Sequence, residues 1–148
     1  AFVIGGGELY AAALPRADFV SIHCPKNPET IGMFNADRLK RMKPKAYLVN
    51  TARGGIVDDA ALATALRERR IAAAALDVFE GEPAVHPGLL EVPNVVLTPH
   101  IASATVATRV AMAELAADNL IAALTGGTAP TPISASDITR RSFTSNAT

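Results

Sequence analysis

Apolar and polar positions along the chain form two kinds of segment. Short apolar runs end in polar or glycine-containing motifs, and longer segments repeat apolar residues three and four positions apart. The short runs predict buried β-strands, and the longer segments predict amphipathic helices. The expected strands are residues 18–22, 46–50, 72–78 and 95–98, and the expected helices are residues 8–14, 35–42, about 58–69 and 105–124.

The last of these helices has the longest apolar stripe. Its apolar residues recur at steps of three and four, which places them on one helix face. Gly126 and Gly127 follow the stripe and are expected to end the helix. The stripe consists of Val106, Val110, Ala113, Ala117, Leu120 and Leu124.

Strands and helices alternate along the chain, which is typical of an α/β fold with a parallel sheet. We therefore expect a partial Rossmann-type, doubly wound parallel sheet in three αβα layers. The small side chains of residues 72–78 suit a central strand covered by helices on both faces. Residues 1–133 are expected to form one domain. Residues 134–148 carry few large apolar groups and are expected to be a flexible tail.

Composition and charge remove several classes of function. Fourteen basic and fourteen acidic residues cancel, so the net charge favours neither nucleic acid nor an anionic membrane as partner. No apolar run approaches the roughly 18–20 residues of a membrane span, and a cytoplasmic location is expected. Cys24 is the only cysteine, which excludes an intramolecular disulfide. No His-x-x-His or Cys-x-x-Cys spacing predicts a metal site.

Three motifs with candidate chemistry each follow a predicted strand. Arg53 lies in Asn-Thr-Ala-Arg-Gly-Gly (50–55), Glu82 in Asp-Val-Phe-Glu-Gly-Glu-Pro (77–83), and His100 in Thr-Pro-His-Ile-Ala-Ser (98–103). In parallel α/β sheets, ligands bind at the carboxyl ends of the strands. We therefore expect the three side chains to converge at one crevice.

These three side chains suit the reduction of a 2-oxo acid. An arginine binds a carboxylate through two parallel hydrogen bonds. An imidazole exchanges protons near neutral pH, and a nearby carboxylate favours its protonated form. The ring can then protonate the alkoxide that develops during carbonyl reduction. Singly, each residue has a structural explanation: an arginine beside a glycine turn, a loop carboxylate and a capping histidine. Their combination favours the catalytic interpretation.

Asp77 ends an otherwise apolar strand. A buried carboxylate is costly without hydrogen-bond partners, so Asp77 is expected to accept a specific hydrogen bond. A backbone amide of the next turn is the structural alternative to a ligand.

The motifs at 50–58, 76–83 and 97–103 resemble those of the D-isomer-specific 2-hydroxyacid dehydrogenases, and the resemblance covers about residues 17–133. It implies that Arg53 binds the substrate carboxylate, that His100 is the acid/base, and that Glu82 pairs with His100. The stretch 86–90 is more similar to glyoxylate/hydroxypyruvate or 2-ketogluconate reductases than to phosphoglycerate dehydrogenases.

The resemblance also implies NAD or NADP as cofactor, a small 2-oxo acid as substrate, and a homodimer, the usual state of the family. Asp77 would face the nicotinamide carboxamide. The implied cofactor contacts are Cys24, Pro25, Thr30, Thr51, Ala52, Arg53, Asp77, His100, Ala102 and Ser103.

The sequence departs from the family in its first residues. The family's Gly-x-Gly-x-x-Gly turn, which binds the pyrophosphate at a helix N-terminus, is not found, because Gly5-Gly6-Gly7 has a different spacing. The family's substrate domain and the residue that selects NAD or NADP are not found either. The chain thus resembles the C-terminal half of an NAD(P)-binding domain, and alone it is expected to bind dinucleotide weakly and turn over negligibly. A dinucleotide-binding scaffold or sensor and an inactive remnant remain alternatives.

Overall fold

The computed structural model describes residues 2–3, 10 and 12–132. The chain divides into two compact units, Ala1–Ala102 and Ser103–Thr148. The tail expected at 134–148 lies outside the described residues. Of the helix expected at 8–14, the described residues Tyr10, Ala12 and Ala13 are helical, and residues 8, 9 and 11 lie outside the description.

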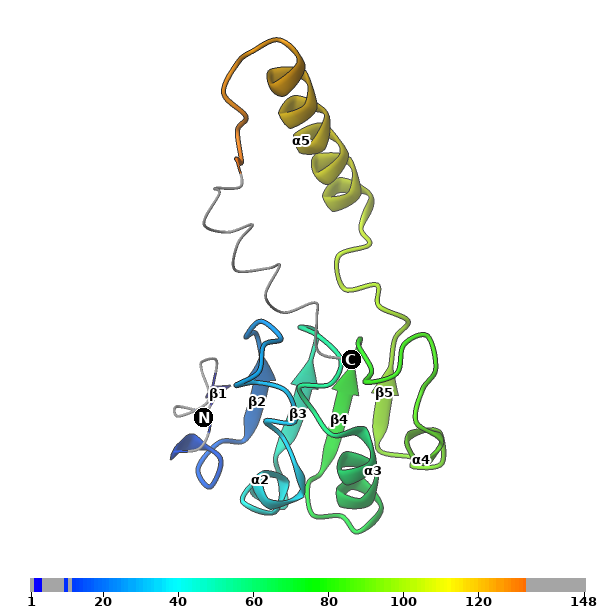
Figure 1. Cartoon of the computed structure of the whole chain (residues 1–148). Helices are drawn as coiled ribbons and strands as arrows, with labels where there is room; N and C mark the ends of the chain where they lie inside the picture. The colour runs from blue at the N-terminus through cyan, green and yellow to red at the C-terminus, as the bar shows by residue number, and fades with distance from the viewer. Residues whose placement is uncertain (1, 4–9, 11, 133–148) are drawn as a thin grey trace. The chain divides into compact units, whose positions relative to one another are not determined.

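The first unit contains a parallel sheet in the order β1-β2-β3-β4-β5 (Figure 1). The parallel sheet with intervening helices is the predicted Rossmann-type α/β architecture. Its strand order is consecutive, so the order reversal of a doubly wound sheet does not fall among these strands. The strands are β1 (Phe2–Val3), β2 (Phe19–Ile22), β3 (Tyr47–Asn50), β4 (Ala73–Leu76) and β5 (Val95–Leu97).

The strand register brings the last residues of four strands level with one another. Ile22 pairs with Asn50, Asn50 with Leu76, and Leu76 with Leu97. The segments that follow these strands therefore leave the sheet at one edge. Each predicted motif begins at that edge, as the parallel topology requires.

Two helices of the first unit lie within predicted segments, and each begins at a polar N-cap. The Asn35 side chain accepts a hydrogen bond from the Arg38 amide and begins α2 (Ala36–Lys40). The Asp58 side chain accepts one from the Ala61 amide and begins α3 (Asp59–Arg67). These bonds satisfy amides that have no partner inside the helix.

A short helix, α4 (Pro87–Leu90), was not predicted. Its Pro-Gly sequence is typical of a loop, but proline is tolerated in the first turn of a helix. The His86 ring supports this turn, since its Nδ1 accepts a hydrogen bond from the Gly88 amide at 3.1 Å.

One face of the sheet carries the core. Val20, Leu48 and Leu76 belong to the same buried cluster as Leu39 of α2 and Leu66 of α3. On the other face, side chains of alternate strand positions remain exposed, namely Phe19, Tyr47 and Val96. Within the described part of this unit, helices therefore cover one face of β4, where we expected both. Right-handed crossovers between consecutive strands place their helices on the same side.

The second unit contains α5 (Val106–Leu124), which matches the predicted helix. The Thr105 side chain caps it by accepting a hydrogen bond from the Thr108 amide at 3.2 Å, and Gly126 follows its end with φ +73°. None of its residues is buried, so the predicted apolar stripe is largely open to solvent. Among the described residues, no helix combines the length and apolar character that a bilayer span requires.

Candidate active site

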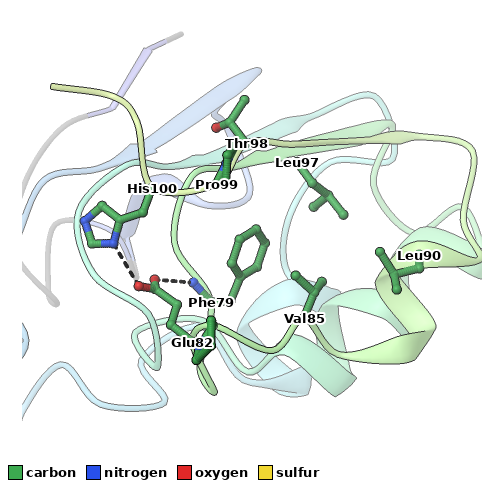
Figure 2. A pocket seen from close by; sticks show the side chains of 9 residues that line it. Phe79, Glu82, Val85, Leu90, Leu97, Thr98, Pro99 and His100 are labelled. Atoms are coloured by element: carbon green, nitrogen blue, oxygen red, sulfur yellow. Dashed lines mark hydrogen bonds and ion pairs between the residues drawn. The ribbon is translucent and has the colours of Figure 1, made fainter. Parts of the chain in front are cut away.

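His100 and Glu82 form a hydrogen-bonded pair beyond the ends of β4 and β5. The imidazole Nδ1 lies 2.8 Å from Glu82 Oε2 (Figure 2). The other carboxylate oxygen, Oε1, accepts a hydrogen bond from the Phe79 amide at 2.9 Å. The His100 hydrogen bond, helped by that of Phe79, lowers the pKa of Glu82 below its usual value. The carboxylate is therefore ionised near neutral pH and holds one ring nitrogen.

The remaining ring nitrogen of His100 is available to a ligand. Half of the His100 side chain is exposed, and its Nε2 has no hydrogen-bond partner in the part of the chain that the structure describes. A ring held at Nδ1 by a carboxylate and open at Nε2 can pass a proton to or from a bound molecule.

Asp77 holds the backbone that presents His100. Its Oδ1 accepts hydrogen bonds from the Thr98 hydroxyl at 2.6 Å and the Ile101 amide at 2.8 Å, and its Oδ2 accepts one from the Ala102 amide at 2.8 Å. Burial alone would raise the pKa of Asp77, but these hydrogen bonds outweigh it, and the pKa is lowered. The geometry therefore matches the structural alternative, in which backbone amides of the next turn bind this carboxylate.

The turn that Asp77 holds contains an unusual backbone conformation. His100 has φ +55°, in the left-handed region that costs a residue with a side chain roughly 1–2 kcal/mol. The hydrogen bonds that the next two amides donate to Asp77 hold this conformation. Backbone strain of this kind clusters at functional sites.

Arg53 is presented by a turn that Asn50 organises. The buried Asn50 side chain accepts a hydrogen bond from the Ala52 amide at 3.1 Å and donates one to the Arg53 carbonyl at 3.2 Å. The Arg53 guanidinium donates to the Ala52 carbonyl at 2.7 Å. Among the described residues, no carboxylate lies within ion-pair distance of it, so most of its donors remain available to an anion.

Gly54 allows the Arg53 turn to meet the loop that carries Glu82. A Cβ atom at this position would lie 1.7 Å from the Phe79 carbonyl oxygen. Any side chain would therefore push the two loops apart. This requirement explains why glycine follows the arginine.

One cavity joins the three predicted catalytic residues. It has a volume of about 230 Å³ and is lined by Arg53, Glu82 and His100 together with Lys26, Gly54, Phe79 and Glu80. Lys26 was missed by sequence reasoning, which treated it as an ordinary loop residue. The available signal was its place after β2, at the same sheet edge. A second cavity, of about 480 Å³, also includes Glu82 and His100 but is lined mainly by apolar side chains (Figure 2).

Comparison with known proteins supports the resemblance seen in the motifs. Residues 8–102 match the family described as D-isomer specific 2-hydroxyacid dehydrogenase, NAD binding domain. The chain belongs to this family. The match includes Arg53, Glu82 and His100.

Several 2-hydroxyacid dehydrogenases are similar to the chain over most of its length. It is 57% identical to a glyoxylate reductase of Thermofilum pendens over 119 residues, which is 79% of this chain and 35% of the relative. It is 51% identical to a 2-ketogluconate reductase of Gluconobacter oxydans over 106 residues, 72% of this chain and 34% of the relative. The chain thus spans about a third of the length of these curated relatives.

A solved structure of the family has the same fold. The NADPH-dependent glyoxylate/hydroxypyruvate reductase of Sinorhizobium meliloti, in complex with NADP and malonate, matches with a TM-score of 0.79 and 46% identity. The match covers 84% of this chain and 39% of that protein.

Some residues expected at the cofactor of a 2-hydroxyacid dehydrogenase fit a ligand better than others. Pro25, Thr51 and Ala102 are exposed at the carboxyl edge of the sheet, and Cys24 and Ala52 are half-buried there. Burial raises the pKa of the Cys24 thiol, so it remains neutral near neutral pH. These positions are accessible to a ligand that binds at this edge of the sheet.

The remaining expected cofactor contacts have other partners or lie elsewhere. The buried Thr30 hydroxyl donates to the Pro25 carbonyl at 2.7 Å, and the Asp77 oxygens bind the hydroxyl and amides described above. Ser103 is the first residue of the second unit. No group of three potential metal-ligating side chains occurs among the described residues.

Proposed function

We propose that this chain is the part of an NAD(P)-dependent D-2-hydroxyacid dehydrogenase that binds the substrate carboxylate and moves the proton. The reaction would transfer a hydride between NAD(P)H and C2 of a small 2-oxo or 2-hydroxy acid. The observation that carries the proposal is that Arg53, Glu82 and His100 line one cavity, with His100 and Glu82 joined at 2.8 Å.

The proposed mechanism assigns a separate task to each residue. Arg53 holds the substrate carboxylate through guanidinium donors that have no carboxylate partner in the described chain, and this orients the adjacent C2 carbonyl. His100 Nε2–H donates a proton to the carbonyl oxygen as C2 is reduced, and Nε2 recovers the proton in the reverse reaction. A bound NAD(P)H supplies the hydride.

Glu82 acts through His100 rather than on the substrate. Its carboxylate accepts the Nδ1–H hydrogen bond, which fixes the ring orientation and stabilises the protonated imidazole. The lowered pKa of Glu82 keeps this carboxylate charged while the ring gains and loses its proton.

The names of the relatives support a small 2-oxo acid as substrate. Glyoxylate reductases and a 2-ketogluconate reductase are among the most similar proteins, and the Sinorhizobium meliloti relative binds NADP. We propose glyoxylate, hydroxypyruvate or 2-ketogluconate as the substrate class and NAD or NADP as the cofactor. The usual state of the family further suggests a homodimer, which light scattering of the intact protein would test.

A chimeric enzyme tests the proposal, because this chain spans about a third of its relatives' length. The matching 119 residues of the Thermofilum pendens glyoxylate reductase would be replaced by those of this chain. We expect the chimera to oxidise NAD(P)H in a glyoxylate-dependent manner. His100→Gln should lower kcat/KM by about 10²- to 10⁴-fold, and Arg53→Gln should chiefly raise KM for glyoxylate.

His86→Gln is the matched control, because His86 caps α4 and does not line the cavity of Arg53 and His100. It should leave turnover close to that of the parent chimera. A folded, cofactor-binding chimera whose turnover survives His100→Gln would contradict the proposal.

A further inference from the structure

Asp59 is a buried carboxylate that the proposed mechanism does not use. Only 4% of this residue is exposed. Its neighbour Asp58 already caps α3 through the Ala61 amide. The Asp59 Oδ2 atom instead accepts a hydrogen bond from the Glu80 amide at 3.0 Å, across 21 residues of sequence. Two adjacent acidic residues at one helix start thus have different tasks.

The amide that donates to Asp59 belongs to the turn that carries Glu82. Within this turn, the Phe79 amide donates to Glu82 Oε1 at 2.9 Å, and the next amide, that of Glu80, donates to Asp59. Gly54 packs against the Phe79 carbonyl. Two consecutive amides and one carbonyl of the turn are therefore fixed. One of these three contacts comes from Gly54, after β3, and another from Asp59, the first residue of α3.

From this geometry we propose that Asp59 is a positioning residue, which holds the Glu80 amide and thereby fixes the turn that directs Glu82 at His100. The importance of this pair for catalysis rests on the proposed function. The positioning itself is a property of the folded chain and can be measured without turnover.

Because Asp59 is buried, its carboxylate depends on the hydrogen bond that the Glu80 amide donates. Burial raises the pKa of Asp59, and the Glu80 amide bond partly offsets that effect. The charged or titratable groups that act on it are Glu80, His86 and Asp58. A buried carboxylate that lost its amide partner would be left with an uncompensated desolvation cost. The carboxylate and the turn therefore hold each other in place.

Carbon-13 NMR titration of the Glu82 side-chain carboxyl in the 148-residue chain tests the proposal. Asp59→Ala removes the acceptor, and Asp59→Leu removes it while filling a similar volume. In either folded variant we expect the pKa of Glu82 to rise toward its usual value, because the relaxed turn weakens its hydrogen bonds with His100 and Phe79. Asp59→Asn retains an acceptor oxygen and should keep the pKa of Glu82 low.

Asp58→Ala is the matched control. It removes the cap of the same helix, but within the described chain Asp58 accepts its hydrogen bond from the Ala61 amide and none from the turn of residues 79–82, so the pKa of Glu82 should not change. An unchanged pKa of Glu82 in both Asp59→Ala and Asp59→Leu would overturn the proposal. An equal rise in Asp58→Ala would also overturn it, because general loosening of α3 would then explain the effect.

The chimeric enzyme gives a second readout. Asp59→Ala should lower kcat by roughly 10- to 100-fold through misplacement of the acid/base pair, with little change in KM, and Asp59→Asn should restore most of the loss. The two proposals fail in different ways. If His100→Gln has no effect on turnover, the proposed function fails, whereas the titration of Glu82 still decides whether Asp59 positions it.

Discussion

Helices α3 and α5 differ in what surrounds their apolar stripes. Leu66 of α3 is fully buried, with 0% of it exposed, whereas Leu120 of α5 is 60% exposed. The same three- and four-residue spacing predicts both helices. Periodicity therefore predicts that a helix forms and which face is apolar, but it does not predict what covers that face. In the first unit a sheet covers α3, while no residue of α5 is buried in the described part of the second unit.

The two units also differ in whether they contain the candidate catalytic residues. Arg53, Glu82 and His100 all lie in the first unit, where buried polar side chains hold the turns that present them. The residues that line the cavity they share belong to the first unit. The stability of the first unit is therefore expected to govern the site, and substitutions on the two units should have very different effects.

The largest difference in stability is expected between the variants Leu66→Ala and Leu120→Ala. Removing the buried Leu66 side chain should lower the free energy of unfolding by about 2–5 kcal/mol. Leu120→Ala, on the exposed stripe, should change it by less than about 0.5 kcal/mol. Urea unfolding followed by circular dichroism measures both. Equal losses would show that α5 is buried in solution and would remove the contrast.

Two glycine substitutions compare the turn at the site with the turn after α5. Gly54→Ala should destabilise the first unit by about 3 kcal/mol, because the new Cβ meets the Phe79 carbonyl. Gly127→Ala, after α5, has its closest neighbour at an ordinary 3.5 Å and should be nearly neutral. Thermal unfolding checks both variants. A stable Gly54→Ala protein would mean that the two loops do not meet as described.

Asp77→Asn should have a smaller effect that depends on pH. Near neutral pH, loss of the charged acceptor should cost about 1–3 kcal/mol. Because the pKa of Asp77 is lowered in the folded state, its contribution is present above its unfolded pKa of about 3.9. The contribution is lost as pH falls through the lower folded pKa.

Urea unfolding of the wild-type chain and of Asp77→Asn between pH 7 and pH 2 measures this dependence. The difference in free energy of unfolding should shrink as the solution becomes acidic. A difference that stays constant over this range would show that the Asp77 charge does not stabilise the turn that presents His100.

Much of the fold could be predicted because it follows from local patterns. β2 to β5 lie within the predicted apolar runs, whereas β1 was not predicted, and α3 and α5 lie within predicted helices. The meeting of Arg53, Glu82 and His100 could also be anticipated, since parallel strands end at one edge. Local patterning and topology were sufficient for these features.

The remaining features depend on contacts between distant segments. The hydrogen bond that the Glu80 amide donates to Asp59 and the place of Lys26 in the cavity arise only after the loops pack. No sequence period signals them. The positive φ of His100 depends on amide bonds with Asp77, 23 residues earlier in the sequence. The helices of the first unit lie on one face of the sheet because its strands are in consecutive order. The sequence pattern alone does not specify that order.

In the proposed mechanism, Arg53 and His100 act on one bound molecule while Glu82 holds the ring. A crystal structure of the chimeric enzyme with NADPH and oxamate, an analogue of glyoxylate, tests this most directly. We expect the oxamate carboxylate to bind the Arg53 guanidinium through two hydrogen bonds. His100 Nε2 should lie within about 3.2 Å of the amide oxygen of oxamate, and Nδ1 should remain on Glu82. Oxamate bound away from Arg53, or a His100 ring turned away from it, would contradict the account.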